Sequence, residues 1–460
     1  MQKKNKRRTP KRDRTAPIYS VVDLETTGTS VNHGDRIIQI GCVLVQDGQV
    51  INHFETKVNP REKIPRAVVQ LTGIQDRDVR KAPLFEDVVG TIYSLLTGTT
   101  FVAHNVNFDF PFLNAELERA GYPPLPIKAI DTVTLSQILL PTAKSFRLRD
   151  LTSSLQIEHD HPHSAVSDAE ATASLLVDLL KRVHDLPTVT LDQLVQMKLD
   201  LPQQTAEVFT AELERRRTHP QPLSEDLFVS HGLVLHKQRL VAVEKATAKV
   251  RYPATRRAKE KLFKDQLAFR PVQAKMMNSI YNNYTHDEPK NMVVEAGTGS
   301  GKTLGYLLPL AYAAFPDKRI VVSTATNLLQ EQVDSQAVRQ LNQVLPFTVN
   351  SVVVKGNQHY IVLEKFVHSL SIIEDSKLVQ LIKAKILVWL LQTTTGDLDE
   401  LNLTTTRSPY FTEIRHRGVR TLNPKSEFYR DDFLVRRNKR LDQADVIITN
   451  HSYLVAHAEL

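Results

Sequence analysis

Cysteine is almost absent from the sequence, since Cys42 is the only one among 460 residues. A single cysteine excludes an internal disulfide, a cysteine-rich zinc site and an iron–sulfur cluster built within the chain, and it suits a reducing compartment. The sequence also lacks any uninterrupted apolar run of the roughly 18 residues that a membrane span needs, and no apolar segment follows the basic N-terminal residues as in a signal peptide. We therefore expect a cytoplasmic protein without a membrane segment.

Acidic residues are almost missing from the first 14 positions, where Asp13 alone stands against eight lysines and arginines. The formal net charge of the whole chain is +8, so the remaining residues are close to neutral. Such a segment is too polar to build a core, and residues 1–16 are predicted to form a disordered basic tail. Two interpretations stay open for it: a solvated arm, or an arm that contacts nucleic-acid phosphates and releases their counterions.

The rest of the chain has the composition of a globular protein, with 41% hydrophobic and 24% charged residues. Its length allows two to four domains. Strand-like runs at 18–24 and 36–46, followed by helical patterns, predict an α/β domain over residues 17–185. Residues 186–262 are predicted to be a helical linker with one small strand pair.

A second α/β unit is predicted over residues 263–460, with an insertion at about 360–440 that is helical near 378–391. In this unit β-type runs alternate with helical patterns, which indicates a parallel sheet. The β-type runs are residues 291–296, 319–325, 348–355 and 444–450, and the helical patterns are residues 303–315 and 327–345.

Two carboxylates stand at positions i and i+2 in residues 20–28, SVVDLETTG. On a strand this spacing places Asp23 and Glu25 on one face, about 6.6 Å apart along the chain, while Val22 and Leu24 point into a core. Gly28 then ends the strand, since glycine tolerates turn geometries. Two carboxylates held together repel each other, so the pair favours binding of a divalent cation.

Two further carboxylates are predicted to lie at helix starts. Asp109 precedes Pro111, which is typical of the first turn of a helix. Asp168 follows Ser167, a plausible N-cap, and His163 lies in the loop five residues before Asp168. Each of these pieces alone is more often a cap or a solvated side chain than a site. Their order within an α/β pattern is what indicates a nuclease.

These motifs resemble the DEDD exonuclease superfamily, in particular its DnaQ-like branch with histidine in the third motif. The resemblance covers residues 17–185 and includes Leu71–Ile74 (LTGI), which looks like the substrate-lining segment of that family. A tyrosine-type member would have Tyr four residues before the last aspartate, where this sequence has Ser164. His159 and His161 lack the family spacing and are interpreted as ordinary loop residues.

The resemblance implies an RNase-H-like domain and a two-metal 3′→5′ exonuclease. Two Mg²⁺ or Mn²⁺ ions would be held by four carboxylates, with His163 as general base on the attacking water. The implied metal ligands are Asp23, Glu25, Asp109 and Asp168. The expected substrate is single-stranded DNA or RNA with a free 3′ end, and Phe108 with its apolar neighbours could stack on bases.

Residues 292–303, MVVEAGTGSGKT, read as a strand, a glycine-rich loop and a helix start. Backbone N–H groups of such a loop cradle phosphates, Lys302 reaches the β and γ phosphates, and Thr303 can hold Mg²⁺. Gln273, upstream in FRPVQ, could meet an adenine. The predicted ATP-binding residues are Ala296, Gly297, Thr298, Gly299, Ser300, Gly301, Lys302, Thr303 and Gln273.

With residues 323–327, Lys355-Gly356 and residues 444–451, this region resembles the first motor domain of DinG/XPD-type helicases, a partial RecA-like fold. The fusion to a DnaQ-like exonuclease resembles the DinG family of the Gram-positive type. Two departures stand out. Val362 occupies the position where many such helicases have a cluster-binding cysteine, and neither Asp431-Asp432 nor residues 446–450 supply an acidic Walker B segment before Leu460.

The favoured hypothesis is therefore a 3′→5′ exonuclease with an ATP-binding, helicase-like region that does not unwind nucleic acid. An ATP-dependent helicase fragment with an accessory nuclease is the alternative. A third hypothesis, a binding module with a decayed nuclease site, conflicts with the intact set of four carboxylates and His163.

Overall fold

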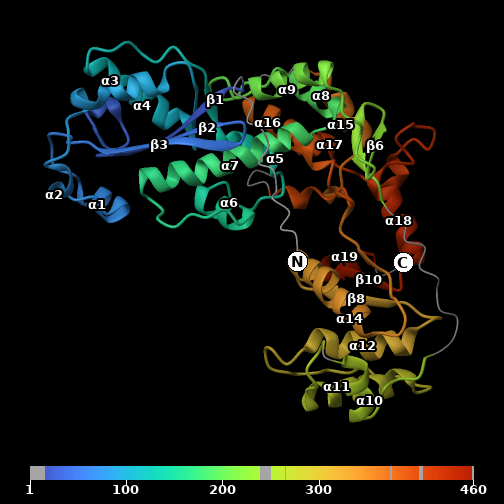
Figure 1. The fold of residues 1–460 in the computed structure, drawn as a ribbon. Coiled ribbons are helices and arrows are strands. Elements are labelled where there is room, and N and C mark those ends of the chain that lie inside the picture. The colour runs from blue at the N-terminus through green and yellow to red at the C-terminus, as the bar shows by residue number, and fades with distance from the viewer. Residues whose placement is uncertain (1–15, 239–249, 265, 373–375, 403–407, 458–460) are drawn as a thin grey trace, which may run out of the picture. The chain divides into compact units, whose positions relative to one another are not determined.

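A computed structural model describes residues 16–238, 250–264, 266–372, 376–402 and 408–457. The predicted basic tail, up to residue 15, lies outside the described residues. The chain divides into two compact units (Figure 1). The first unit comprises Met1–His236, Val367–Thr393 and Asp399–Thr406, and the second comprises Lys237–Phe366, Thr394–Leu398 and Arg407–Leu460. Within the described ranges, no helix has both the length and the hydropathy to cross a bilayer.

The first unit is built on a five-stranded mixed sheet in the order β3-β2-β1-β4-β5. β1, β2 and β3 are antiparallel, whereas β4 pairs parallel with both β1 and β5. This is the RNase-H-like arrangement that the family resemblance implies. The strands are β1 (Ile18–Thr26), β2 (Ile37–Gln46), β3 (Gln49–Lys57), β4 (Thr100–Ala103) and β5 (Ala129–Asp131).

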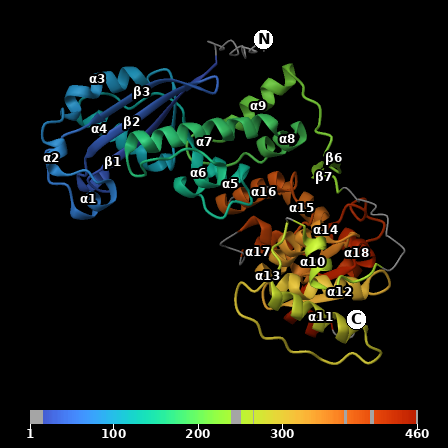
Figure 2. The ribbon, with the colours of Figure 1, turned by 60° about the horizontal axis from the view of Figure 1, so that its bottom comes forward.

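Helices cover both faces of this sheet (Figure 2). Val22 and Leu24 point into a core that contains apolar side chains of α3 and α4, while α7 packs on the opposite face against β1 and β2. The two faces differ because side chains alternate along a strand. The helices of this part are α1 (Arg66–Thr72), α2 (Asp76–Val79), α3 (Phe85–Leu96), α4 (Val106–Arg119), α5 (Thr132–Leu139), α6 (Leu148–Leu155) and α7 (Ala165–Asp185), with a 3₁₀ turn at Val31–His33.

The first unit also contains a helix from far along the chain. The predicted helix near residues 378–391 is present as α16 (Lys377–Trp389), and it packs against α5 and against α8 (Thr188–Gln196). Trp389 is fully buried, and its indole N–H donates to Glu400 Oε2 at 2.8 Å. The other elements here are α8 (Thr188–Gln196), α9 (Glu207–Thr218), the antiparallel hairpin β6 (Leu227–Ser230) and β7 (Leu233–His236), and the 3₁₀ turn at Leu398–Leu401.

The second unit is built on a three-stranded parallel sheet in the order β8-β10-β9, as the alternating pattern predicts. The strands are β8 (Ile320–Thr324), β9 (Ser351–Val353) and β10 (Val446–Asn450). Its helices are α10 (Arg256–Phe263), α11 (Pro271–Thr285), α12 (Lys302–Ala314), α13 (Asn327–Gln332), a π-helical segment (Val333–Val338), α14 (Arg339–Val344), α17 (Pro409–Ile414), α18 (Phe433–Gln443) and α19 (His451–Ala456), with 3₁₀ turns at Asn357–His359 and Val419–Thr421. α15 (Leu363–Leu370) lies where the chain passes from this unit into the first.

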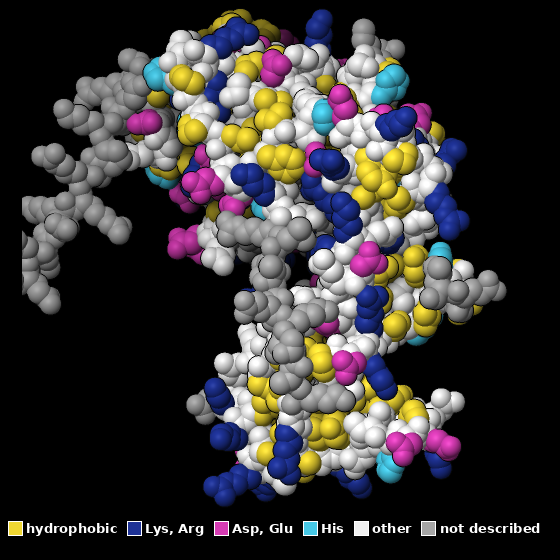
Figure 3. Space-filling model, turned by 90° about the vertical axis from the view of Figure 1, so that its right-hand side faces the viewer, with side chains coloured by type: hydrophobic (Ala, Val, Ile, Leu, Met, Phe, Trp, Pro, Cys, Tyr) yellow, Lys and Arg dark blue, Asp and Glu magenta, His cyan; other side chains and the backbone are white. Residues whose placement is uncertain are grey.

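One predicted strand of the second unit is wrong. Residues 291–296 have no regular secondary structure, because no described strand pairs with them, and a strand is stabilised by its neighbours. Val293 is fully exposed, and Val321 of the edge strand β8 is 52% exposed. Hydrophobic surface over the α10–α12 region is visible in the lower part of Figure 3. The unit therefore leaves apolar surface in contact with solvent.

Candidate active site and nucleotide-binding loop

Asp23 and Glu25 lie near the end of β1 on the face that the i, i+2 spacing predicts. Their neighbours Val22 and Leu24 are buried in the opposite core, with 1% and 5% exposure. Gly28 follows the strand, as predicted. Its backbone φ lies outside the left-handed region that favours glycine, so a special turn geometry does not explain this residue. A Cβ at this position would lie 2.3 Å from the carboxylate of Asp35, so a larger residue here would displace the Asp35 side chain.

Strand β2 holds the start of α7 above these carboxylates. Gly41 is the cross-strand partner of Asp23, and a Cβ on Gly41 would lie 2.2 Å from the carbonyl oxygen of Ala165. Gln39 is the partner of Glu25, and its Oε1 accepts a hydrogen bond from the Ala165 N–H at 3.2 Å. The residues opposite the two acids therefore fix the first turn of α7, which carries the third acid.

That third acid is Asp168, and it meets the other two. Carboxylate oxygens of Asp23, Glu25 and Asp168 lie within 4.8 Å of one another. The helix begins earlier than predicted, at Ala165 with Ser164 in the N-cap position. Ser167 is therefore not the cap, and its hydroxyl instead accepts a hydrogen bond from the His161 N–H at 3.3 Å.

Asp109 borders this group from the first turn of α4. It is 2% exposed, and its Oδ1 accepts a hydrogen bond from the Leu24 N–H, between the two acids of β1, at 3.1 Å. Pro111 does not start the helix as predicted, because α4 begins at Val106 and Pro111 lies inside it. The helix instead starts from Asn105 in a left-handed conformation, with φ of 86°.

A buried aspartate fixes this helix start. Oδ1 of Asp131 accepts hydrogen bonds from the N–H groups of Asn105 and Val106, both at 3.0 Å. His104, just before them, lies 2.9 Å from Thr132 Oγ1 through Nδ1 and 3.0 Å from the Phe146 carbonyl through Nε2. Burial lowers the pKa of His104. We interpret these residues, which the sequence did not single out, as the support that sets the direction of Asp109.

The carboxylates are strongly perturbed in the protein without metal. Burial raises the pKa of Asp23 well above its ordinary value, and the charges of Asp109, Asp168 and Glu25 raise it further. Burial, with the charge of Asp168, raises the pKa of Glu25 to about 8. Burial also raises the pKa of Asp109 to about 8, although the Leu24 N–H acts in the other direction. A cation among these oxygens would remove the repulsion, and an all-oxygen donor set fits Mg²⁺ or Mn²⁺.

Two histidines near Asp168 lie in different surroundings, and one of them differs from the expectation. His163 has an exposed side chain and a backbone φ of 68°. Its backbone N–H donates to Asp168 Oδ2 at 3.2 Å. His159, predicted to be an ordinary loop residue, is 7% exposed at its side chain and places Nε2 at 2.6 Å from Asp168 Oδ1. Sequence reasoning missed His159 because its contact depends on how the loop folds back, which spacing does not reveal.

The two predicted base-contacting positions are also in the first unit. Leu71, in the last turn of α1, is 57% exposed. Phe108 is partly buried and packs against Phe112, with ring centroids 5.6 Å apart. Leu71 is thus the freer of the two for contact with a base.

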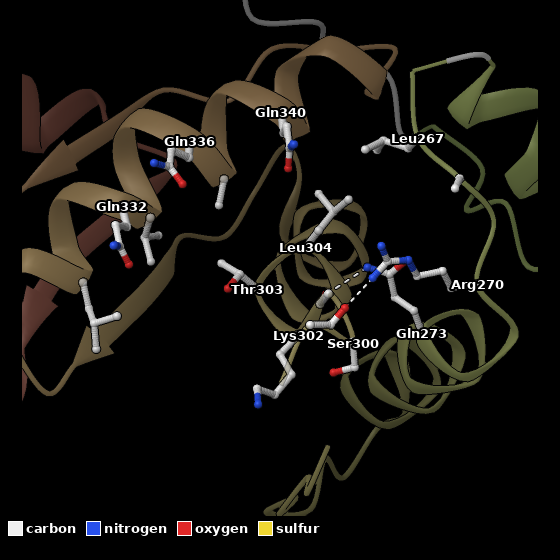
Figure 4. Close-up of a pocket in the computed structure, with 16 residues that line it drawn as sticks. Leu267, Arg270, Gln273, Ser300, Lys302, Thr303, Leu304, Gln332, Gln336 and Gln340 are labelled. Carbon is white, nitrogen blue, oxygen red and sulfur yellow. Dashed lines mark hydrogen bonds between the residues drawn. The ribbon is translucent and has the colours of Figure 1, made fainter. Parts of the chain in front are cut away.

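In the second unit the glycine-rich loop leads into α12, which begins at Lys302. Gly299 and Gly301 have φ of 74° and 79°, values that favour glycine. Lys302 Nζ donates to the Ala296 carbonyl at 2.8 Å. Gln273 Nε2 donates to the Gly301 carbonyl at 2.8 Å (Figure 4). Gln273 thus contacts the loop itself.

A cavity opens beside this loop, and Figure 4 shows side chains from three segments around it. Lys302 and Thr303 come from the start of α12, Arg270 comes from the turn before α11, and Gln340 comes from α14. Arg270 also donates to the Gly299 carbonyl. The loop, its lysine and its threonine therefore line one cavity.

The segments resembling helicase motifs come together in the second unit. Ser323 Oγ lies 2.7 Å from His451 Nδ1, and Asn450 Nδ2 donates to Asn327 Oδ1 at 2.9 Å. Asp432 caps α18, and its Oδ2 lies 2.8 Å from His416 Nε2. Val362 is 4% exposed.

The two predicted α/β regions of the sequence match two different protein families. Residues 20–176 match the sequence profile of the Exonuclease family, and residues 270–403 match that of the DEAD/DEAH box helicase family. The likeness to a solved structure of Exonuclease X in complex with 5′ overhanging duplex DNA has a TM-score of 0.28 at 25% identity. It covers 35% of this chain and 91% of the other.

Similarity to curated proteins extends over nearly the whole chain. The chain is 32% identical over 442 residues to 3'-5' exonuclease DinG of Bacillus subtilis (strain 168). The match covers 95% of this chain and 47% of that protein. The chain is 31% identical over 440 residues to 3'-5' exonuclease DinG of Staphylococcus aureus (strain USA300), with the same shares covered. The chain spans about half the length of these relatives. With an exonuclease-type domain ahead of a helicase-type region, the chain belongs to the DinG family.

Proposed function

We propose that the first unit is a metal-dependent 3′→5′ exonuclease that hydrolyses phosphodiester bonds at the 3′ end of a single strand. The observation that carries this proposal is the convergence of Asp23, Glu25 and Asp168 within 4.8 Å, bordered by buried Asp109. Several carboxylates that lie this close together repel one another, and such clusters are typical of cation-binding sites.

The four acids would hold two divalent cations through their oxygens. When bound, such a pair of ions activates the attacking water and stabilises the leaving 3′ oxygen. Asp23 and Glu25 offer the oxygens of the strand, and Asp168 offers those of α7. Asp109 adds a carboxylate whose direction is set by the Leu24 N–H.

His163 is the residue that would accept the proton from the attacking water. Its backbone is tied to Asp168 Oδ2, while its imidazole is exposed and free to turn toward a substrate. Histidine is a common general base for proton transfer from water in enzymes. The Asp168 carboxylate would thus serve both the cation and the placement of the base.

A flexible single strand fits this site because its 3′ end must reach acids that are mostly buried. Leu71 offers an exposed apolar side chain near the end of α1 for contact with a base. DNA and RNA both carry the phosphodiester that the acids would act on, and the substrate class is therefore a 3′-ended single strand of either kind.

The test is degradation of a 5′-labelled single-stranded oligonucleotide with Mn²⁺ or Mg²⁺. The intact chain should shorten it from the 3′ end, and Asp23→Ala/Glu25→Ala should not. Asp185→Asn, an exposed acid at the end of the same helix as Asp168, is the matched control and should retain activity. Absence of a ladder with either metal would refute the proposal.

We further propose that the glycine-rich loop of the second unit binds ATP. In the present arrangement Lys302 donates to carbonyls of its own loop, and a phosphate chain would replace these acceptors with a stronger, charged one. Retention of a fluorescent ATP analogue by the intact chain, and its loss in Lys302→Ala, would support this role. An effect of ATP on the degradation ladder would assign the loop a regulatory function.

A further inference from the structure

His159 connects two helices at the nuclease site. Its Nε2 lies 2.6 Å from Asp168 Oδ1 in the first turn of α7, and its Nδ1 lies 3.4 Å from Thr152 Oγ1 in α6. Both partners are well covered, since Thr152 is 1% exposed and the side chain of Asp168 is 14% exposed. A surface histidine would not be held between two such groups.

We propose that His159 is a positioning residue, which holds the carboxylate of Asp168 in the direction needed to bind the catalytic cation. This inference rests on the proposed cation site and adds a residue outside the set of four acids and His163. The imidazole N–H donates to Oδ1, and the His163 backbone N–H donates to Oδ2. Both oxygens of Asp168 are therefore oriented by donors from the same loop.

The physical reason lies in the freedom of an aspartate side chain. Without donors, the Asp168 carboxylate could rotate away from Asp23 and Glu25 to reduce the repulsion among the three. A hydrogen bond at 2.6 Å to a charged acceptor is strong enough to oppose that rotation. Partners of this kind typically change metal affinity or activity by about 10–100-fold when they are removed.

The contact also links the cation to the proposed base. Because Asp168 Oδ2 accepts from the His163 backbone, a displaced carboxylate would release the loop that presents His163. Loss of His159 should therefore weaken the metal first and slow catalysis as a consequence. Loss of His163 should slow catalysis and leave the metal site intact.

The experiment compares five forms of the full chain: wild type, His159→Phe, His159→Gln, His163→Gln and His161→Gln. Phenylalanine keeps the volume of the ring without a donor, while glutamine can place an N–H near the position of Nε2. His161→Gln is the matched control, since His161 lies in the same loop with an exposed side chain. Mn²⁺ binding is measured by calorimetry, and single-strand cleavage is measured as kcat against Mn²⁺ concentration. Thermal unfolding of each variant is recorded as well.

His159→Phe should bind Mn²⁺ about 10–100-fold more weakly, with kcat recovering at high Mn²⁺. His159→Gln should regain most of the affinity, and His161→Gln and His163→Gln should bind like wild type. The proposal is overturned if His159→Phe binds Mn²⁺ normally, if high Mn²⁺ leaves its kcat low, or if the wild type binds no Mn²⁺. If Mn²⁺ affinity follows this order while no form cleaves the strand, the positioning role stands and the exonuclease proposal fails.

Discussion

The most direct consequence of the buried carboxylates concerns the protons that leave when a metal binds. Burial places the pKa of Glu25 and of Asp109 at about 8, so both acids are mainly protonated at neutral pH in the metal-free protein. A divalent cation binds the ionised form. Titration of the chain with Mn²⁺ or Mg²⁺ at pH 7 should therefore release protons into the buffer.

The magnitude follows from the two pKa values. A group with a pKa of about 8 is about 90% protonated at pH 7 and only about 10% protonated at pH 9. Glu25 and Asp109 together should thus release close to two protons at pH 7 and very few at pH 9. With two protons displaced, the apparent metal affinity should rise by about 100-fold per pH unit below pH 8.

Calorimetric titration in two buffers of different ionisation enthalpy measures the proton count directly. Glu25→Gln should lower the count at pH 7 by about one, because the amide has no proton to release. Asp185→Asn, exposed on α7, should leave the count unchanged. Metal binding with less than about half a proton released at pH 7 would show that these acids are already ionised, and the electrostatic account of the site would be wrong.

Other perturbations test the same structure from different directions. In the metal-free protein the pKa values of Glu25 and Asp109 are about 8 in the folded state and about 4 in the unfolded state. The folded state is therefore stabilised by these two protons at pH values below about 4, and this stabilisation is lost as the pH rises through about 8. The Tm of the chelated protein should accordingly fall between pH 6 and 8.5, and less so in Glu25→Gln; a Tm independent of pH would contradict this. Gly41→Ala should cost about 1–3 kcal/mol and reduce cleavage, since its Cβ would press on the Ala165 carbonyl under α7; unchanged Tm and rate would refute the packing argument. Lys302→Ala should weaken binding of a fluorescent ATP analogue at least about tenfold without changing Mn²⁺ binding to the first unit.

Local patterns in the sequence were sufficient for much of the fold. The alternation around Asp23 predicts the face of β1 correctly, because side-chain direction on a strand depends only on position. The parallel sheet of the second unit and helix α12 also follow from local periodicity. Residues 291–296 show the limit of this reasoning, since β propensity without a paired neighbour does not make a strand.

Contacts between distant segments could not be predicted in the same way. Gly41 looks like any glycine in a strand, and only the approach of Ala165 explains it. His159 has no motif spacing, and its role follows from a loop that returns to Asp168. The support of α4 by Asp131 is likewise a contact across 25 residues of sequence. Such positions become visible only when tertiary packing brings the partners together.

The most informative departure from chain order is α16, which lies within the stretch that matches the helicase profile and yet packs in the first unit. Its fully buried Trp389, the only tryptophan of the chain, is a native probe of that unit. Trp389→Ala in the full chain should cost about 3–5 kcal/mol, because truncation leaves a large cavity.

A fragment of residues 1–236 should also have a lower Tm than the first unit within the full chain, since it lacks α16 and exposes the apolar surfaces of α5 and α8. Both changes should lower nuclease activity at elevated temperature before they affect Mn²⁺ binding at low temperature. If residues 1–236 unfold at the same temperature as the first unit of the full chain, α16 contributes nothing to the stability of that unit. If the fragment is less stable, the first unit depends for its stability on a helix that begins about 140 residues after the end of the fragment, and the two units cannot be separated at residue 236 without loss.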